Sequence, residues 1–197
     1  MKMQHHLIIA AGITVFAGLA EAQNLIGNGT FESDSVGLNS PSGWYNQTGE
    51  GRNWVFTNGS FANAGSGKHA MVQDFTPNKP GATSNLTTAF VSSSVAFNLT
   101  FDYGAHLNTQ GAGVGTFFVK INGSPIWSMM TTLGVGGTFN QNFSATQGVN
   151  TLTFEVVGVG EEASVAVDNV VVRAIPEPSS LCLLGLGAVG LVRRRRR

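Results

Sequence analysis

The feature that most constrains the fold is a two-residue alternation of apolar and polar side chains. In the stretch VAFNLTFDYGA, large apolar residues occupy every second position from Val95 to Tyr103, with polar or small residues between them. Successive side chains of a β-strand point to opposite faces, so this pattern predicts a strand with one buried face. No stretch between residues 24 and 173 holds a helical period over twelve residues, which argues against helices there.

Later stretches repeat the β signature. GTFFVKINGSPIWSM has two β-rich runs around Asn122-Gly123, a residue pair that favours a type I′ hairpin turn. NTLTFEVVG alternates again, and SVAVDNVVVR shifts its phase midway, which predicts a β-bulge near Asp168-Asn169. We therefore predict an all-β fold, an antiparallel two-sheet jelly-roll sandwich of about eight to ten strands.

The two ends of the chain differ from its body. Residues 1–22 contain Lys2, an apolar core and the sequence Ala20-Glu21-Ala22, which predicts a secretory signal peptide cleaved before Gln23. An uncleaved anchor is the alternative, and the glycines within the segment argue against it. Residues 23–174 form one predicted domain, and the stretch from 23 to 192 that contains it has five basic residues and ten acids, an acidic balance. Residues 175–197 form a tail with the single cysteine, so no intrachain disulfide is expected.

The tail has three parts in a fixed order. Pro176, Glu177 and Pro178 come first, an apolar segment reaches Val192, and the end is Arg193, Arg194, Arg195, Arg196 and Arg197. As a helix, residues 179–192 would rise about 21 Å, against about 30 Å for a bilayer core, which predicts a short transmembrane anchor. The arginines would then stay in the cytoplasm. The alternative, a basic tail that binds nucleic acid, fits neither the acidic body nor the adjoining apolar segment.

This order of parts resembles the PEP-CTERM sorting signal of Gram-negative bacteria. The resemblance implies recognition by exosortase, a membrane protease-transpeptidase, and processing near the Pro-Glu-Pro sequence. It also implies a protein that is first anchored in the inner membrane and then reaches the cell surface or the extracellular polysaccharide matrix.

The body has a resemblance of its own. NLIGNGTFES, SGKHAMVQ and VAVDNVVV resemble segments of carbohydrate-binding, galactose-binding-like jelly-roll domains, whose opening segment and closing strand lie side by side. We therefore expect a strand around Leu25–Phe31 beside residues 165–172. In that family this place holds a structural calcium ion, which implies Glu32, Asp168 and the backbone carbonyl of Lys68 as ligands.

The residues themselves give a reason for a cation. Two carboxylates brought together by neighbouring strands repel each other unless a proton or a cation joins them. Calcium binds carboxylates together with the backbone carbonyls that turns supply. The alternative is that Glu32 and Asp168 simply accept hydrogen bonds from backbone amides at strand ends.

Nothing in the sequence indicates catalysis. His69 and His106 lie in different runs without metal-ligand spacing, and no nucleophile elbow, phosphate loop or zinc motif occurs. A glycosidase needs two carboxyl groups that face each other across a cleft. Glu155 with Asp102 or Asp74 is a conceivable pair, but the spacing does not demand it. We expect that the protein is not an enzyme.

Aromatic residues are the better functional candidates, because sugar rings stack on aromatic faces. We select Tyr45, Trp54 and Trp127 as candidate ligand-binding residues and expect Trp44 in the core. The sequence therefore predicts a surface or matrix protein whose sandwich binds exopolysaccharide and no nucleic acid. Two alternatives are a structural matrix or adhesion protein without a ligand site, and a glycan-active enzyme.

Overall fold

The computed structural model describes residues 23–47, 52–57, 61–63, 67–74, 81–105, 113–159 and 163–175. The predicted signal peptide, the sorting tail and His106 lie outside the described residues. Within the described ranges the regular structure is entirely β, and no helix there is long and apolar enough to cross a membrane.

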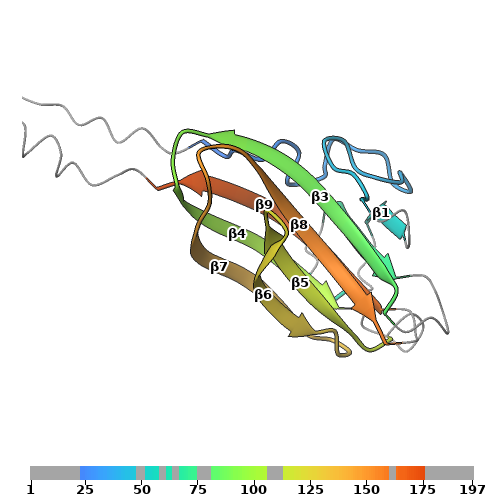
Figure 1. The fold of residues 1–197 in the computed structure, drawn as a ribbon. Coiled ribbons are helices and arrows are strands. Elements are labelled where there is room, and N and C mark those ends of the chain that lie inside the picture. Colours follow the sequence, from blue (N-terminus) through green and yellow to red (C-terminus); the bar gives the residue numbers. More distant parts are fainter. Residues whose placement is uncertain are drawn as a thin grey trace, which may run out of the picture.

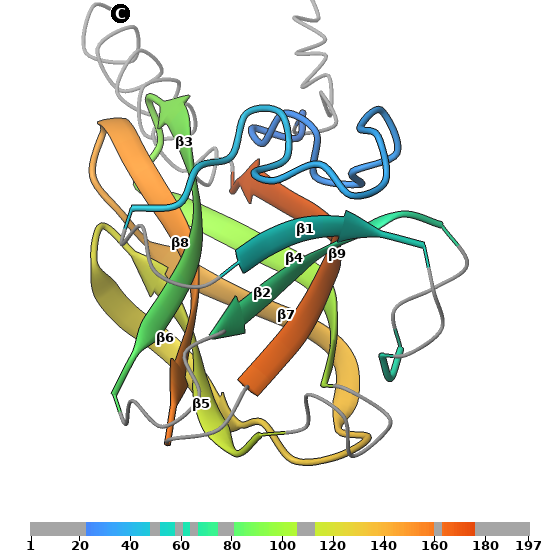
Figure 2. The ribbon, with the colours of Figure 1, turned by 90° about the vertical axis from the view of Figure 1, so that its right-hand side faces the viewer.

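Nine strands form two antiparallel sheets, as the sequence predicts (Figures 1 and 2). The five-stranded sheet has the order β1-β2-β9-β4-β7 and consists of β1 (Arg52–Phe56), β2 (His69–Asp74), β9 (Ala163–Ala174), β4 (Ala96–Ala105) and β7 (Gly136–Ser144). The four-stranded sheet has the order β3-β8-β5-β6 and consists of β3 (Thr83–Ser92), β8 (Gly148–Gly158), β5 (Gly115–Ile121) and β6 (Ser124–Met130).

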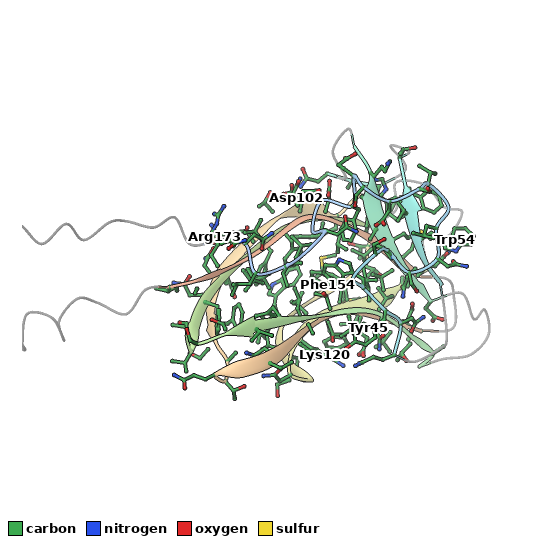
Figure 3. The ribbon with its side chains drawn as sticks, turned by 90° about the horizontal axis from the view of Figure 1, so that it is seen from above. Tyr45, Trp54, Asp102, Lys120, Phe154 and Arg173 are labelled. Carbon is green, nitrogen blue, oxygen red and sulfur yellow. The ribbon has the colours of Figure 1, made fainter. Side chains whose placement is uncertain are left out.

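The core lies between the sheets and follows the alternation in the sequence. The inward residues Phe97, Leu99 and Phe101 of β4 are at most 1% exposed, and the inward residues of β8 are fully buried. Phe154 is at the centre of this core (Figure 3), with its ring centroid 4.9 Å from that of Phe101 and 5.8 Å from that of Trp44. Burial of these rings removes apolar area from water, which stabilises the sandwich.

The predicted hairpin turn is confirmed. Asn122 and Gly123 connect β5 to β6, with φ angles of 50° and 79°. Both angles are positive, as a type I′ turn requires, and asparagine and glycine adopt such angles at the lowest cost.

The predicted bulge is confirmed and belongs to β9. In the pairing of β9 with β4, Thr100 lies opposite Val171 and Asp102 lies opposite Asp168. Two residues of β9 between these pairs, Asn169 and Val170, therefore face a single residue of β4. Asn169 has a φ of 51°, so the bulge turns the chain at the point where the hydrophobic phase shifts.

Beyond the bulge, the opening segment of the chain takes the place of β2 beside β9. β2 pairs with β9 as far as Val167, and the opening segment bonds to β9 from residue 170 onward. The Val170 N–H donates to the Gly29 carbonyl over 2.8 Å, and the Leu25 N–H donates to the Val172 carbonyl over 2.8 Å. The predicted neighbourhood of the two chain ends is therefore confirmed.

The prediction of a strand around Leu25–Phe31 is wrong, because the segment runs through turns. Asn28 and Phe31 have φ angles of 52° and 56°, which an extended strand does not allow. The Asn28 side-chain amide also donates to the Asp34 carboxylate over 2.6 Å, which draws the segment into a turn instead of a ladder.

Candidate functional site

Glu32 and Lys68, predicted from the sequence as partners in one site, lie in contact. The Lys68 backbone N–H donates to Glu32 Oε1 over 2.7 Å. The Lys68 ammonium donates to the backbone carbonyls of Glu32 and Asp34, over 2.7 and 2.6 Å. A Cβ on Gly67 would stand 1.9 Å from Glu32 Oε1, so only glycine leaves room for the carboxylate at this position.

Asp168 completes a group of three carboxylates at the bulge of β9. It is 5% exposed, and its Oδ1 accepts the Asn169 N–H over 2.7 Å. Burial raises the pKa of Asp168 to about 7; the Asn169 N–H opposes this, and the carboxylates of Glu32 and Asp102 add to it. Asp102, directly opposite on β4, accepts hydrogen bonds from the Thr138 hydroxyl and the Asn169 side chain.

The carboxylate oxygens at the bulge could bind a hard cation only together with backbone carbonyl oxygens. Glu32 and Asp168 supply carboxylate oxygens, and the adjoining turns supply carbonyl oxygens, the ligands that calcium prefers. Among the described residues, no three side chains of His, Cys, Asp or Glu lie close enough to hold a metal ion alone. The Lys68 ammonium already bonds two of the nearby carbonyls, so a cation would have to use others, such as that of Lys68.

Tyr45 lies beside β3, at the edge of the four-stranded sheet and away from Asp102 (Figure 3). Its backbone bridges Thr87 of β3 through two hydrogen bonds of 2.9 and 2.8 Å. The strand register continues from Thr87 to Thr153 and then to Lys120, so these residues form one row across the sheet. We call this row, with Phe118 and Glu155 beside it, the Tyr45 face. Tyr45 is 41% exposed.

A charged pair stands at the other side of the Tyr45 face. Lys120 Nζ lies 2.5 Å from Glu155 Oε1, with side chains that are 22% and 15% exposed. The same ammonium lies 5.5 Å from the centre of the Phe118 ring. The two threonine hydroxyls of the row bond each other over 3.0 Å and are covered. The groups that can meet a ligand are therefore one aromatic ring and one ion pair.

The two candidate tryptophans lie elsewhere. Trp54, on the edge strand β1, is partly buried and stacks on Phe56 at 5.7 Å, over a small apolar cluster around Phe61. Trp127, on β6, packs against the core, with its ring 5.2 Å from those of Tyr103 and Phe139. Trp44 is 4% exposed, as predicted. Tyr45, Trp54 and Trp127 thus belong to three separate parts of the sandwich and form no single patch.

The remaining chemical candidates are also separated. Glu155 lies on the outer face of the four-stranded sheet, whereas Asp102 lies on the far side of the sandwich, and Asp74 is fully buried. His69 is 1% exposed beside the rings of Phe56 and Phe61, and burial lowers its pKa. Sequence reasoning missed Lys120, and it considered Asp102 and Glu155 only as catalytic acids, because their true neighbours depend on strand register.

Comparison with known proteins identifies the tail. Residues 174–197 match the family model described as the PEP-CTERM protein-sorting motif. The chain carries a PEP-CTERM sorting signal. The motif indicates a protein that is exported and anchored by its C-terminus before processing, and it implies recognition by exosortase. No curated protein matches the chain.

Solved structures support the fold of the body. The domain TmCBM61, solved with β-1,4-galactotriose, aligns at a TM-score of 0.51 and 15% identity, over 78% of this chain and 100% of that one. The CBM22-1 xylan-binding domain of Paenibacillus barcinonensis Xyn10C aligns at a TM-score of 0.51 and 15% identity. The alignment covers 80% of this chain and 97% of that one. The K1 cleaved adhesin domain of Lys-gingipain from Porphyromonas gingivalis aligns at a TM-score of 0.52 and 13% identity. The alignment covers 75% of this chain and 96% of that one.

The same fold also occurs as part of larger proteins. The PEP-CTERM protein spans only 21% of the enzymatically active domain of bacteriophage CBA120 tailspike protein 4 and 26% of an α-L-arabinofuranosidase, MgGH51. Identities of 14% to both show a shared sandwich fold and nothing finer.

The carboxylate group makes stability depend on pH. The folded pKa of Asp168, about 7, lies above its ordinary value of 3.8, so the folded state binds this proton more tightly than the unfolded state does. Without a cation, the stabilisation is complete below about pH 4 and is lost as pH rises through 7. We predict that the free energy of unfolding of residues 23–175 in EDTA falls over this window, by at most about 4 kcal/mol.

Urea denaturation at a series of pH values checks this prediction, with Asp168→Asn as the matched variant. Asparagine keeps the shape without the titrating proton, so the fall between pH 5 and 8 should largely disappear. An identical slope in both proteins would show that Asp168 does not carry the effect.

Proposed function

We propose that the sandwich of this exported protein is a non-catalytic module that binds exopolysaccharide through the Tyr45 face. The observation that carries the proposal is Tyr45, a residue that is 41% exposed and stands at one end of a row that finishes at an ion pair. An exposed aromatic ring beside fixed polar groups is the usual chemistry of a sugar subsite, because the ring takes the C–H face and the polar groups bond hydroxyls.

The ion pair favours a hydroxyl-rich ligand over a charged one. Lys120 and Glu155 neutralise each other, so the end of the row away from the ring offers a donor and an acceptor with no net charge. Sugar hydroxyls can bond both groups at once, whereas an acidic polymer would meet the Glu155 carboxylate. The shared fold gives general support, since the two aligned modules are described as a galactotriose complex and a xylan-binding domain.

A second function has a specific observation in its favour. All three tryptophans pack against other aromatic rings, and none is among the exposed large apolar residues. A structural matrix or adhesion protein without a ligand site needs no exposed aromatic surface, and it would leave Tyr45 as an ordinary surface residue. A glycan-active enzyme has less support, because Glu155 is paired with Lys120, which lies on the opposite side of the sandwich from Asp102 (Figure 3).

We also propose that Glu32, Asp168 and the carbonyl of Lys68 hold one structural calcium ion. The support is the repulsion between the buried Asp168 carboxylate and the exposed Glu32 carboxylate, together with the turn oxygens around them. The ion would join the opening segment to the final strand in a domain that has no disulfide, as its lone cysteine, Cys182, lies in the tail.

Removal of the Tyr45 ring tests the glycan proposal. We expect the isolated sandwich to bind oligosaccharides on a glycan array, and Tyr45→Ala to weaken binding about 3- to 10-fold, the worth of one stacked ring. Tyr45→Phe keeps the ring and should bind like the parent. Trp54→Ala and Trp127→Ala, on other parts of the sandwich, should retain binding wherever the variant folds.

Two outcomes would count against the Tyr45 face. If Tyr45→Ala bound as tightly as the parent, the sugar site would lie elsewhere. If the folded parent bound no glycan of any class, the structural matrix function would be favoured instead.

Chelation tests the calcium proposal. A ligand present at a hundredfold its dissociation constant stabilises the folded state by about 2.7 kcal/mol, or roughly 5–10 °C in melting temperature for a domain of this size. We expect EDTA to lower the melting temperature of residues 23–175 and added Ca²⁺ to restore it. Asp168→Ala should abolish the response, and Glu155→Gln, on the opposite sheet, should keep it. A melting curve indifferent to EDTA and to Ca²⁺ rejects the ion.

A further inference from the structure

The chain leaves the sandwich at an end that has its own surface chemistry. We call it the exit end and define it as residues 91–96, 144–149 and 173–175, which comprise two turns and the end of β9. The Ile175 N–H donates to the Ala96 carbonyl over 2.8 Å, and the Ala145 N–H donates to the Val95 carbonyl over 3.0 Å. The described part of the chain begins and ends there (Figure 1).

Three exposed valines stand at the exit end. Val91 and Val149 are 66% and 67% exposed and lie directly opposite each other in the pairing of β3 with β8. Val95, in the adjoining turn, is 44% exposed. The strand pairing fixes Val91 and Val149 side by side, and Val95 adds an exposed apolar side chain in the turn that follows β3.

The exit end also lacks acids, although the body as a whole has an excess of them. Its only charged residue among the described ones is Arg173, which is exposed near the point where the chain leaves (Figure 3). The described carboxylates lie further along the strands, for example Asp102 and Asp168 at the bulge and Glu155 opposite Asn85. The exit end is therefore apolar and weakly basic, which suits contact with anionic lipid.

The covalent connection limits how far the exit end can stand from the membrane. The PEP-CTERM signal anchors the unprocessed chain through residues that begin at about Ser179. Only three residues separate Ser179 from Ile175, and the four residue steps between them span at most about 14 Å. The opposite end of the sandwich is further away by the length of a ten-residue strand, about 33 Å.

We propose that the unprocessed protein stands on the lipid surface through its exit end, with Val91, Val95 and Val149 in the headgroup region. Three valines would bind a bilayer only weakly, but the tether supplies a high effective concentration and converts a weak contact into a fixed orientation. Arg173 adds attraction to anionic headgroups. The contact holds Pro176-Glu177-Pro178 at the bilayer surface, where a membrane-embedded protease can reach it.

The opposite end provides an internal control. Its exposed apolar residues, Met130, Leu133 and Val159, are 61%, 54% and 66% exposed, so it is at least as apolar as the exit end. If hydrophobicity alone decided the contact, this end would enter the bilayer as readily. Because the tether holds the exit end near the membrane, we predict that the opposite end does not enter the bilayer. The inference is independent of the proposed glycan binding, since it uses neither Tyr45 nor the carboxylates.

Fluorescent labelling of the anchored chain tests the proposal. The full chain with Cys182→Ser is given single cysteines by Val91→Cys, Val149→Cys, Leu133→Cys or Val159→Cys, and each is labelled with an environment-sensitive dye. The proteins are reconstituted into phosphatidylglycerol-containing vesicles with spin-labelled lipids. We expect blue-shifted, quenched emission at positions 91 and 149 and water-like, unquenched emission at positions 133 and 159.

The other outcomes overturn the proposal. Quenching at positions 133 and 159, or no quenching anywhere, would mean that the exit end does not rest on lipid. Quenching at a dye attached through Tyr45→Cys would mean that the sandwich lies on its side. A signal at positions 91 and 149 that required exosortase in the vesicle would make the contact a protein-docking site. In the supporting case, Val91→Ser with Val149→Ser leaves the chain anchored but abolishes quenching of a dye placed by Val95→Cys.

Discussion

The β-bulge in β9 is the constraint on which the arrangement of this protein depends. Asn169 turns the strand with a positive φ, and beyond it the partner of β9 changes from β2 to the opening segment of the chain. The exchange lets a segment that is not a strand bond to the middle of a sheet. It also places Glu32 beside Asp168, so a local change in strand geometry joins residues 136 positions apart.

The sandwich divides its surface into three chemically distinct regions. The Tyr45 face offers a ring and a neutralised ion pair, the bulge gathers carboxylates under the opening turns, and the exit end presents valines beside the membrane tether. Because the tether fixes one end of the strands near the bilayer, the Tyr45 face along their length remains open to the surroundings. The proposed glycan contact would then be accessible both before and after the tail is processed.

The sequence predicts those features that depend on local periodicity. Alternation identified the buried face of β4, the pair Asn122-Gly123 identified a turn, and the phase shift identified the bulge. The prediction of a strand at Leu25–Phe31 was wrong, because the Asn28 side chain donates a hydrogen bond to Asp34 and draws the segment into a turn although it has apolar neighbours. The row from Tyr45 to Lys120 was also out of reach, since it spans four chain segments whose register is set by tertiary packing.

Amide hydrogen exchange measures the central pairing most directly. The opening segment is bonded to β9 at Leu25 and Val170, and these bonds lie beside the core rather than in a free terminus. In the folded body, the account predicts that the Leu25 and Val170 amides exchange slowly, with opening free energies close to that of Phe154 in the core. Exchange at Leu25 and Val170 as fast as that of an unstructured terminus would contradict the account.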